Sequence, residues 1–222
     1  MKINGNTKYG AIFDMDGVLV ESHDISWGSF TEVMGREGVE LSTEDIQGAL
    51  GKSLRDSIED WNRKYGLSLE LHKFGPAAWE IQKRELEKIH PDSRLITLLD
   101  DLKSHKIPMA VGTNSAGYRA EAIVELLGLQ SYFPTIVSAS DVEYHKPHPD
   151  LFLKAASRIK IAPKKCVVIE DAFDGIEAAK RGNMIAIGYL NAHNTREDLR
   201  NADLIITDFS EVSYERIREL VN

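Results

Sequence analysis

The sequence contains a single cysteine, fewer basic than acidic residues and no long apolar segment. Because Cys166 is alone, no disulfide can form within the chain, and its position in the apolar run Cys166–Ile169 predicts a small buried side chain rather than a reactive thiol. No apolar run approaches the length that crosses a bilayer, and the first ten residues lack the apolar stretch of a secretory signal. A reducing, cytoplasmic setting without membrane association is therefore expected.

Basic residues are outnumbered by acidic ones, 27 against 35, which gives a formal charge of −8 at pH 7. Nucleic acids and anionic membranes both require a basic surface, so neither is expected as a partner. An anionic small molecule can still bind where a few cations gather. With 222 residues, of which 42% are hydrophobic, the chain suits one sizeable domain or one domain with a smaller insertion. A monomer is expected by default.

Short apolar runs recur along the chain and predict the strands of a parallel sheet. They are nearly continuous and rich in β-branched residues, which is typical of strands covered on both faces. Amphipathic stretches with apolar residues at helical spacing alternate with them, so we predict an α/β fold with a Rossmann-like, doubly wound parallel sheet. The runs are Tyr9–Phe13, Met109–Thr113, Thr135–Ser138, Cys166–Ile169, Met184–Ile187 and Leu204–Ile206.

The interval from Glu21 to about Pro91 breaks this alternation. It contains helix-like stretches and no convincing strand, and these stretches are Trp27–Gly35, Thr43–Leu50, Leu54–Tyr65 and Trp79–His90. We therefore predict a helical cap domain, residues 21–91, inserted into an α/β core domain formed by residues 1–20 and 92–222.

Polar residues stand at or beyond the ends of four predicted strands. Because the carboxyl ends of parallel strands meet at one edge of a sheet, we expect these side chains to converge there. Each alone is explained equally well as a turn former or helix cap. Clustered carboxylates, however, repel one another and need a cation, and oxygen ligands suit Mg²⁺ rather than zinc. The set is Asp14, Asp16, Thr113, Asn114, Ser115, Lys146, Glu170 and Asp171.

The order and spacing of these residues resemble the four motifs of the haloacid dehalogenase superfamily, in its phosphatase and phosphomutase branch with a helical cap. The motifs lie at residues 14–22, 111–115, 146–150 and 170–179, and the resemblance covers essentially the whole chain. It implies that Asp14 attacks phosphorus and forms an aspartyl-phosphate, while Asp16 acts first as general acid and then as general base. It also implies an Mg²⁺ ion held by the Asp14 carboxylate, the Asp16 carbonyl and Asp171, with Glu170 ligating directly or through water.

The same resemblance implies that Thr113, the backbone N–H groups of Asn114 and Ser115, and Lys146 hold the transferred phosphoryl group. A nearby cation such as Lys146 is also required on electrostatic grounds. The attacking carboxylate and the phosphate are both negative, and two unit charges of like sign about 4 Å apart repel by about 4 kcal/mol at an effective dielectric near 20. An acid role for Asp16 also requires its surroundings to raise its pKa, since a free aspartic acid titrates at about 3.9.

Hydrolysis of a small phosphorylated metabolite is the reaction that we expect, with a β-phosphoglucomutase-type phosphosugar mutase as the main alternative. The resemblance places a histidine of the mutases four residues after Ser22, where this chain has Ser26. It places a substrate-gripping arginine directly after the element Gly51–Ser53, where this chain has Leu54. Arg55 is one position late, and Lys52 is a possible substitute as a point charge. Both departures favour a phosphatase.

Two further alternatives receive less support from the sequence. Dehalogenases of the superfamily lack the second acid, which is present here as Asp16. A non-catalytic binding or regulatory protein on the same scaffold has no use for a nucleophile such as Asp14. A sugar phosphate, a phosphoglycolate-like acid and a nucleoside monophosphate all remain open as substrates.

Overall fold

A computed structural model of the chain describes residues 9–49 and 52–222. Its strands are β1 (Gly10–Phe13), β2 (Met109–Gly112), β3 (Ile136–Val137), β4 (Cys166–Glu170), β5 (Ile185–Tyr189) and β6 (Leu204–Ile206). Its α-helices are α1 (His23–Arg36), α2 (Thr43–Ala49), α3 (Leu54–Tyr65), α4 (Leu71–Leu86), α5 (Ser93–Ser104), α6 (Gly117–Leu126), α7 (Asp150–Arg158), α8 (Phe173–Arg181) and α9 (Tyr214–Leu220). Short 3₁₀ turns are η1 (Ala139–Asp141), η2 (Pro163–Lys165) and η3 (Phe209–Glu211).

The strands form one sheet in the order β3-β2-β1-β4-β5-β6, with every neighbouring pair parallel. From β1 the chain builds outward through β2 and β3, then crosses to the other side of β1 and builds outward again through β4, β5 and β6. This confirms the predicted doubly wound α/β fold. The strand order reverses beside β1, which is where open sheets of this kind bind ligands.

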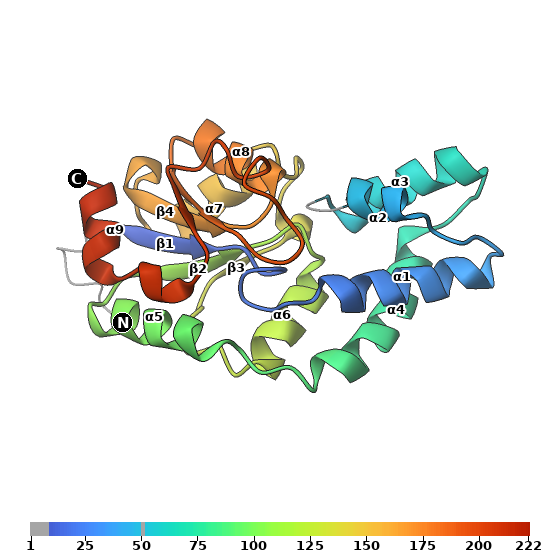
Figure 1. Cartoon of the computed structure of the whole chain (residues 1–222), viewed down its shortest axis with the longest axis horizontal. Helices are drawn as coiled ribbons and strands as arrows, with labels where there is room; N and C mark the ends of the chain where they lie inside the picture. Colours follow the sequence, from blue (N-terminus) through green and yellow to red (C-terminus); the bar gives the residue numbers. More distant parts are fainter. Residues whose placement is uncertain (1–8, 50–51) are drawn as a thin grey trace.

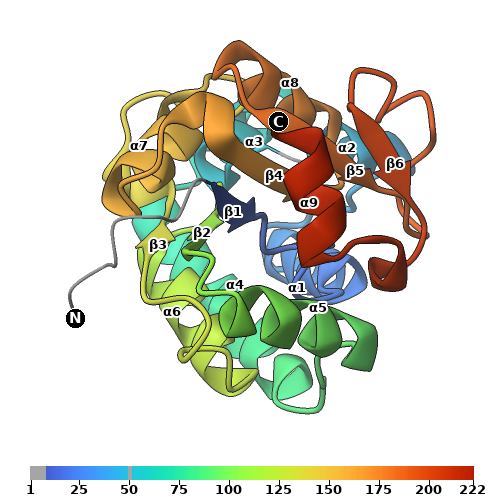
Figure 2. The ribbon, with the colours of Figure 1, turned by 90° about the vertical axis from the view of Figure 1, so that its left-hand side faces the viewer.

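Helices cover both faces of the sheet, because alternate residues of each strand point to opposite sides. Ala11 and Phe13 of β1 pack with α5, α6 and α9, whereas Ile12 packs with α7 and α8. Figure 2 shows the sheet lying between these two layers. The sole cysteine, Cys166, is fully buried in the second layer, as predicted, and burial raises the pKa of its thiol to about 12.

The segment between β1 and α5 is helical, as its sequence predicts, and lies beyond one end of the sheet (Figure 1). Its helices α1 to α4 enclose a small apolar core of their own, in which Ile58, Trp61 and Phe74 are buried. The division into a core domain and a cap domain at residues 20/21 and 91/92 stays a prediction; we use the name cap for α1 to α4. Across the described ranges 9–49 and 52–222, no helix combines the length and apolarity that crossing a membrane requires.

Two expectations concern residues that the structure leaves undescribed. The first is that the N-terminal ten residues lack a secretory signal, and residues 1–8 of that segment lie outside the described ranges. The second concerns the cap. Residue 50 ends the helix-like stretch Thr43–Leu50, residue 51 begins the element Gly51–Ser53, and both lie outside the described ranges.

Candidate active site

The residues that follow β1 and β4 meet at the point where the strand order reverses. Asp14 extends β1, and its backbone N–H donates to the carbonyl of Ile169 in β4 at 2.9 Å. Glu170 ends β4 and Asp171 follows it directly. All three acids are buried, and together with Thr113 and Lys146 they line one cavity between the sheet edge and the cap. These side chains therefore lie together, as the sequence predicts.

Lys146 is the cation at the centre of this group. Its Nζ donates to Asp14 Oδ1 and, at 2.7 Å, to Glu170 Oε1. Burial disfavours the ammonium form, but the attraction of Asp14 and Glu170 outweighs it and raises the pKa of Lys146 above its usual range. Its 5% exposure leaves little water to screen these contacts. Lys146 therefore remains charged and holds the carboxylate of Asp14 in place.

When Asp14, Glu170 and Asp171 are all ionised, Lys146 alone does not balance them, since three carboxylates and one ammonium sum to −2. Burial raises the pKa of Asp14 well above its ordinary value, with Glu170 and Asp171 adding to the effect of burial and Lys146 opposing it. Burial and Glu170 raise the pKa of Asp171 to about 7. A divalent cation would offset this excess, and an all-oxygen donor set suits Mg²⁺. The residues present therefore fit the expected ion.

Glu170 already uses both of its carboxylate oxygens within the protein. Oε1 accepts from Lys146, and Oε2 accepts from the backbone N–H of Ala172 at 2.7 Å. The chain makes room for this side chain at Gly175, where an added Cβ would lie 1.8 Å from Oε1. Glu170 therefore anchors Lys146 and the start of the following loop, whatever it contributes to an ion.

Gly17 lets the loop after Asp16 pass close to the side chain of Asp171. Its φ of +82° turns the chain sharply after Asp16, and its N–H donates to the carbonyl of Val20 at 2.7 Å. A Cβ at this position would lie 2.0 Å from Asp171 Oδ2 and 2.5 Å from a ring carbon of His23. Only glycine lets the loop pass between these two side chains.

Asp16 corrects one expectation from the sequence. Its two oxygens each accept a hydrogen bond of 2.7 Å from the guanidinium of Arg119, and they also accept from Ser22 and Ser115. Burial disfavours the ionised form of Asp16, but Arg119 and the two hydroxyls outweigh it and hold its pKa well below the usual range. The expectation that its surroundings raise this pKa is wrong for the arrangement seen here, because the cation nearest to Asp16 is a buried arginine.

Arg119 is the functional candidate that the sequence reasoning missed. It lies on α6, one turn after Ser115, on a helix face whose other buried residues are Ala120, Ile123 and Val124. The sequence did hold a signal for this role, because Arg119 is a charged residue on an otherwise apolar helix face and lies four positions after Ser115 of the predicted phosphate loop. Its Nε donates to Gln82 Oε1 of cap helix α4 at 2.9 Å, so Arg119 joins the cap to Asp16.

The predicted phosphate-binding residues lie where β2 ends. Thr113 and Asn114 are buried; Thr113 Oγ1 accepts from the backbone N–H of Ser115 at 3.1 Å, and Asn114 Oδ1 accepts from the backbone N–H of Lys146 at 3.2 Å. Ser115 Oγ donates to Asp16 at 2.8 Å. Ser115 thus contacts Asp16 directly, whereas Thr113 and Asn114 hold the backbone of Ser115 and of Lys146. The role of these residues toward a phosphoryl group stays a prediction.

The cavity has a volume of about 1480 Å³ and is lined from both sides. The cap contributes Lys52 and Arg55, both at some distance in sequence from the acids. Lys52 Nζ donates to Asp60 Oδ2 at 2.9 Å, whereas Arg55 is exposed. Ser26, which stands where the mutases have a histidine, lines the cavity and its hydroxyl accepts from Arg119 at 3.3 Å.

The sequence of the chain matches the model of a known family. The sequence model of the haloacid dehalogenase-like hydrolases matches residues 11–189, which include all of the acids and Lys146. The chain belongs to this family. Membership confirms the predicted resemblance and the expectation of an enzyme.

Named relatives of this haloacid dehalogenase-like hydrolase act on phosphorylated compounds. Fructose-1-phosphate phosphatase YqaB of Escherichia coli is 34% identical over 184 residues, covering 80% of this chain and 94% of the relative. A phosphorylated carbohydrates phosphatase of Thermotoga maritima is 28% identical over 198 residues, covering 87% and 91% of the two chains. The crystal structure of β-phosphoglucomutase from Clostridium difficile superposes with a TM-score of 0.85 at 26% identity, covering 97% of each chain.

Proposed function

We propose that this haloacid dehalogenase-like hydrolase is an Mg²⁺-dependent phosphatase of a small phosphorylated metabolite, with a sugar phosphate as the favoured class. The observation that carries the proposal is the buried contact of Lys146 with Asp14 at the sheet edge, inside a cavity that the cap helps to line. A phosphoryl group that entered there would meet a nucleophile and a cation together. The sugar-phosphate activities named for the relatives support the substrate class.

Asp14 is the proposed nucleophile. A carboxylate oxygen forms a bond to phosphorus as the bond from phosphorus to the substrate oxygen breaks, which leaves an aspartyl-phosphate and an alkoxide that takes up a proton. Lys146 orients Asp14 and offsets the repulsion between this carboxylate and the phosphate dianion. Mg²⁺, for which Asp14, the Asp16 carbonyl, Asp171 and Glu170 are the proposed ligands, would supply further positive charge against the phosphoryl oxygens.

Asp16 is proposed to carry the proton in both halves of the reaction. In the first half a protonated Asp16 gives its proton to the leaving alkoxide; in the second, its carboxylate removes a proton from the water that attacks the aspartyl-phosphate. The arrangement seen, with both oxygens of Asp16 accepting from Arg119, matches the second role. For the first role, one oxygen of Asp16 must give up its hydrogen bond from Arg119 and take up a proton instead.

Arg119 is therefore expected to position Asp16. Replacing it in Arg119→Lys should lower kcat by about 10- to 100-fold with KM changed less than about threefold, because lysine cannot hold two carboxylate oxygens in one plane. The measurement is steady-state kinetics on the best substrate. Arg158→Lys is the matched control, since Arg158 is an exposed arginine that bonds to Ile136 and Asp141 away from the cavity. Equal kcat values for Arg119→Lys and Arg158→Lys would show that Arg119 does not position Asp16.

The cavity supports a substrate larger than phosphate alone. Its volume exceeds the roughly 300–1,000 Å³ of common small-molecule sites, so a sugar phosphate fits with space for water. Trp27, Phe30 and Trp79 line its cap side and offer apolar faces to the C–H groups of a sugar ring. Arg55 offers an exposed cation for an anionic or polyhydroxylated substrate.

A panel of about a hundred phosphorylated metabolites tests the proposal against its main alternative. Release of inorganic phosphate from sugar phosphates, with much lower rates for nucleoside monophosphates and phosphoglycolate, is expected. The mutase is favoured by the structural similarity to β-phosphoglucomutase, so β-glucose 1-phosphate is tested with its bisphosphate. Conversion to glucose 6-phosphate without phosphate release would establish the mutase. No turnover of any compound would contradict both.

A further inference from the structure

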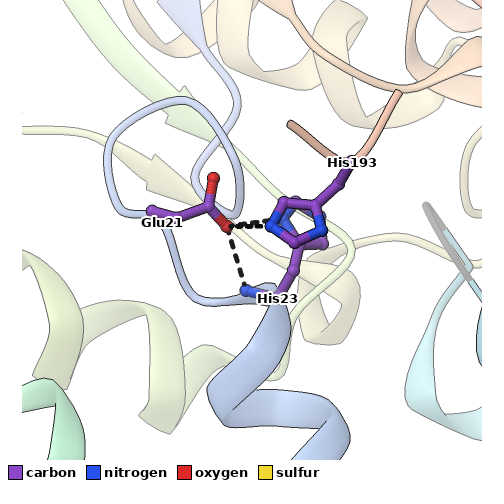
Figure 3. Close-up of side chains that lie close together, drawn as sticks. All are labelled: Glu21, His23 and His193. Atoms are coloured by element: carbon purple, nitrogen blue, oxygen red, sulfur yellow. Dashed lines mark hydrogen bonds and ion pairs between the residues drawn. The ribbon is translucent and has the colours of Figure 1, made fainter. Parts of the chain in front are cut away.

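A second group of ionisable side chains lies beside the acids and plays no part in the proposed chemistry. Glu21, His23 and His193 place one ligand atom each within 4.8 Å of the others, and within residues 9–49 and 52–222 they are the only three such groups to do so. His23 Nδ1 lies 3.0 Å from Glu21 Oε1, and His193 Nε2 lies 3.3 Å from the same oxygen. Figure 3 shows Glu21 opposite the two imidazole rings, whose centroids are 4.9 Å apart.

Two of these three separations match those of a small tetrahedral metal centre. Zinc binds imidazole nitrogens and carboxylate oxygens at about 2.0–2.1 Å, so neighbouring ligand atoms at the corners of such a tetrahedron lie about 3.3 Å apart. The distances from Glu21 Oε1 to the two nitrogens fall close to this value. Two imidazoles and one carboxylate suit zinc and similar transition metals, whereas Mg²⁺ prefers oxygen alone.

The loop that presents His193 is held in place on the core. The backbone N–H of His193 donates to Asn191 Oδ1 at 2.8 Å, and Asn191 Nδ2 donates to Asp171 Oδ2 at 2.8 Å and to the carbonyl of Gly17 at 3.2 Å. Asn194 Nδ2 donates to the carbonyl of Asp171 at 2.6 Å. His193 is thus oriented by the same elements that hold the candidate active site.

His23 is held equally well from the other side. Its ring packs against Gly17 so closely that a Cβ there would lie 2.5 Å from Cε1. With Nδ1 turned toward Glu21, Nε2 lies 3.8 Å from Asp171 Oδ2. A histidine that binds a metal through one nitrogen and faces a carboxylate with the other has the orientation that metal-ligating histidines usually take.

We propose that Glu21, His23 and His193 form a second cation site, selective for zinc-class transition-metal ions and distinct from the expected Mg²⁺ site. Because His23 and His193 also line the cavity, water from the cavity would supply the fourth ligand. Glu21 and His23 lie where the chain passes from the core into cap helix α1, and His193 lies on the core loop after β5. The ion would therefore join the base of the cap to the core.

Calorimetric titration of the purified protein with ZnCl₂, in a buffer containing excess Mg²⁺, tests this proposal. Binding of one ion per chain is expected, with affinity reduced at least about tenfold in His193→Ala and in Glu21→Gln. His148→Ala is the matched control, because His148 is exposed and its side chain contacts Asp150 and Tyr144 rather than any of the three proposed ligands. It should bind zinc as the wild type does.

Asp14→Asn separates the two metal sites, since zinc held by the active-site acids would be lost in that variant while the proposed site would keep its ion. Absorption of bound Co²⁺ in the visible range gives a second readout, because its intensity reports tetrahedral coordination. Undiminished binding in both His193→Ala and Glu21→Gln, loss of binding in Asp14→Asn, or no binding by the wild type would each overturn the proposal. The test measures binding alone, so its outcome is independent of the phosphatase assays.

Discussion

Replacing the proposed nucleophile in Asp14→Asn is expected to lower turnover by about 10⁴-fold or more while leaving the fold intact. An amide oxygen does not attack phosphorus at a useful rate, so the loss should appear in kcat rather than in KM. The fold should persist because an asparagine oxygen can still accept the hydrogen bond of Lys146, which keeps its second partner Glu170. Phosphate release from the best substrate and thermal unfolding by circular dichroism provide the two measurements.

The control for Asp14→Asn must remove one carboxylate from the same region of the chain. Asp24→Asn does so, since Asp24 is exposed in the first turn of α1 and changes only a surface charge there. It should keep the wild-type rate within about twofold. A rate near that of the wild type in Asp14→Asn would show that the covalent mechanism is wrong.

Removal of divalent metal is the second change with a large expected effect. Dialysis against EDTA should lower the rate by at least about a hundredfold, and added Mg²⁺ alone should restore it. The reason is that the ionised carboxylates of Asp14, Glu170 and Asp171 repel one another and an incoming phosphate dianion, and the raised pKa values of Asp14 and Asp171 show that Lys146 alone does not offset this repulsion. The measurement is phosphate release before dialysis, after it and after the addition of Mg²⁺.

The return of activity with Mg²⁺ alone also separates the active site from the proposed zinc-class site, because EDTA empties both. Activity that survived exhaustive dialysis would contradict the assignment of the metal. Recovery only with zinc would place the essential ion among ligands that include histidine, and would then contradict the choice of Asp14 and Asp171 as its carboxylates.

Much of the fold was predictable because its signals are local. The apolar runs of the sheet are short, nearly continuous and bounded by helical periodicity, so each strand is marked by its own sequence. Asp14 and Glu170 could be assigned to one site because parallel topology alone brings the ends of their strands to the same edge.

Contacts between side chains on different elements, within the core and between core and cap, could not be predicted in this way. Arg119 meets Gln82 across 37 positions and Asp16 across 103, and no local pattern records which helix faces will oppose one another. The pKa of Asp16 was misjudged for this reason, since its sign depends on a cation that tertiary packing supplies. The approach of His193 to Glu21 and His23 likewise depends on a loop near the far end of the chain.

The central claim is that Asp14 carries the phosphoryl group during turnover, and direct detection of that group tests it best. Wild-type protein is mixed with its best substrate and Mg²⁺, quenched in acid within the first turnover, digested with pepsin at low pH and analysed by tandem mass spectrometry. We expect one added phosphoryl group on Asp14, absent from Asp14→Asn. A phosphoryl group on another residue, or turnover with none on the protein at any quench time, would contradict the mechanism.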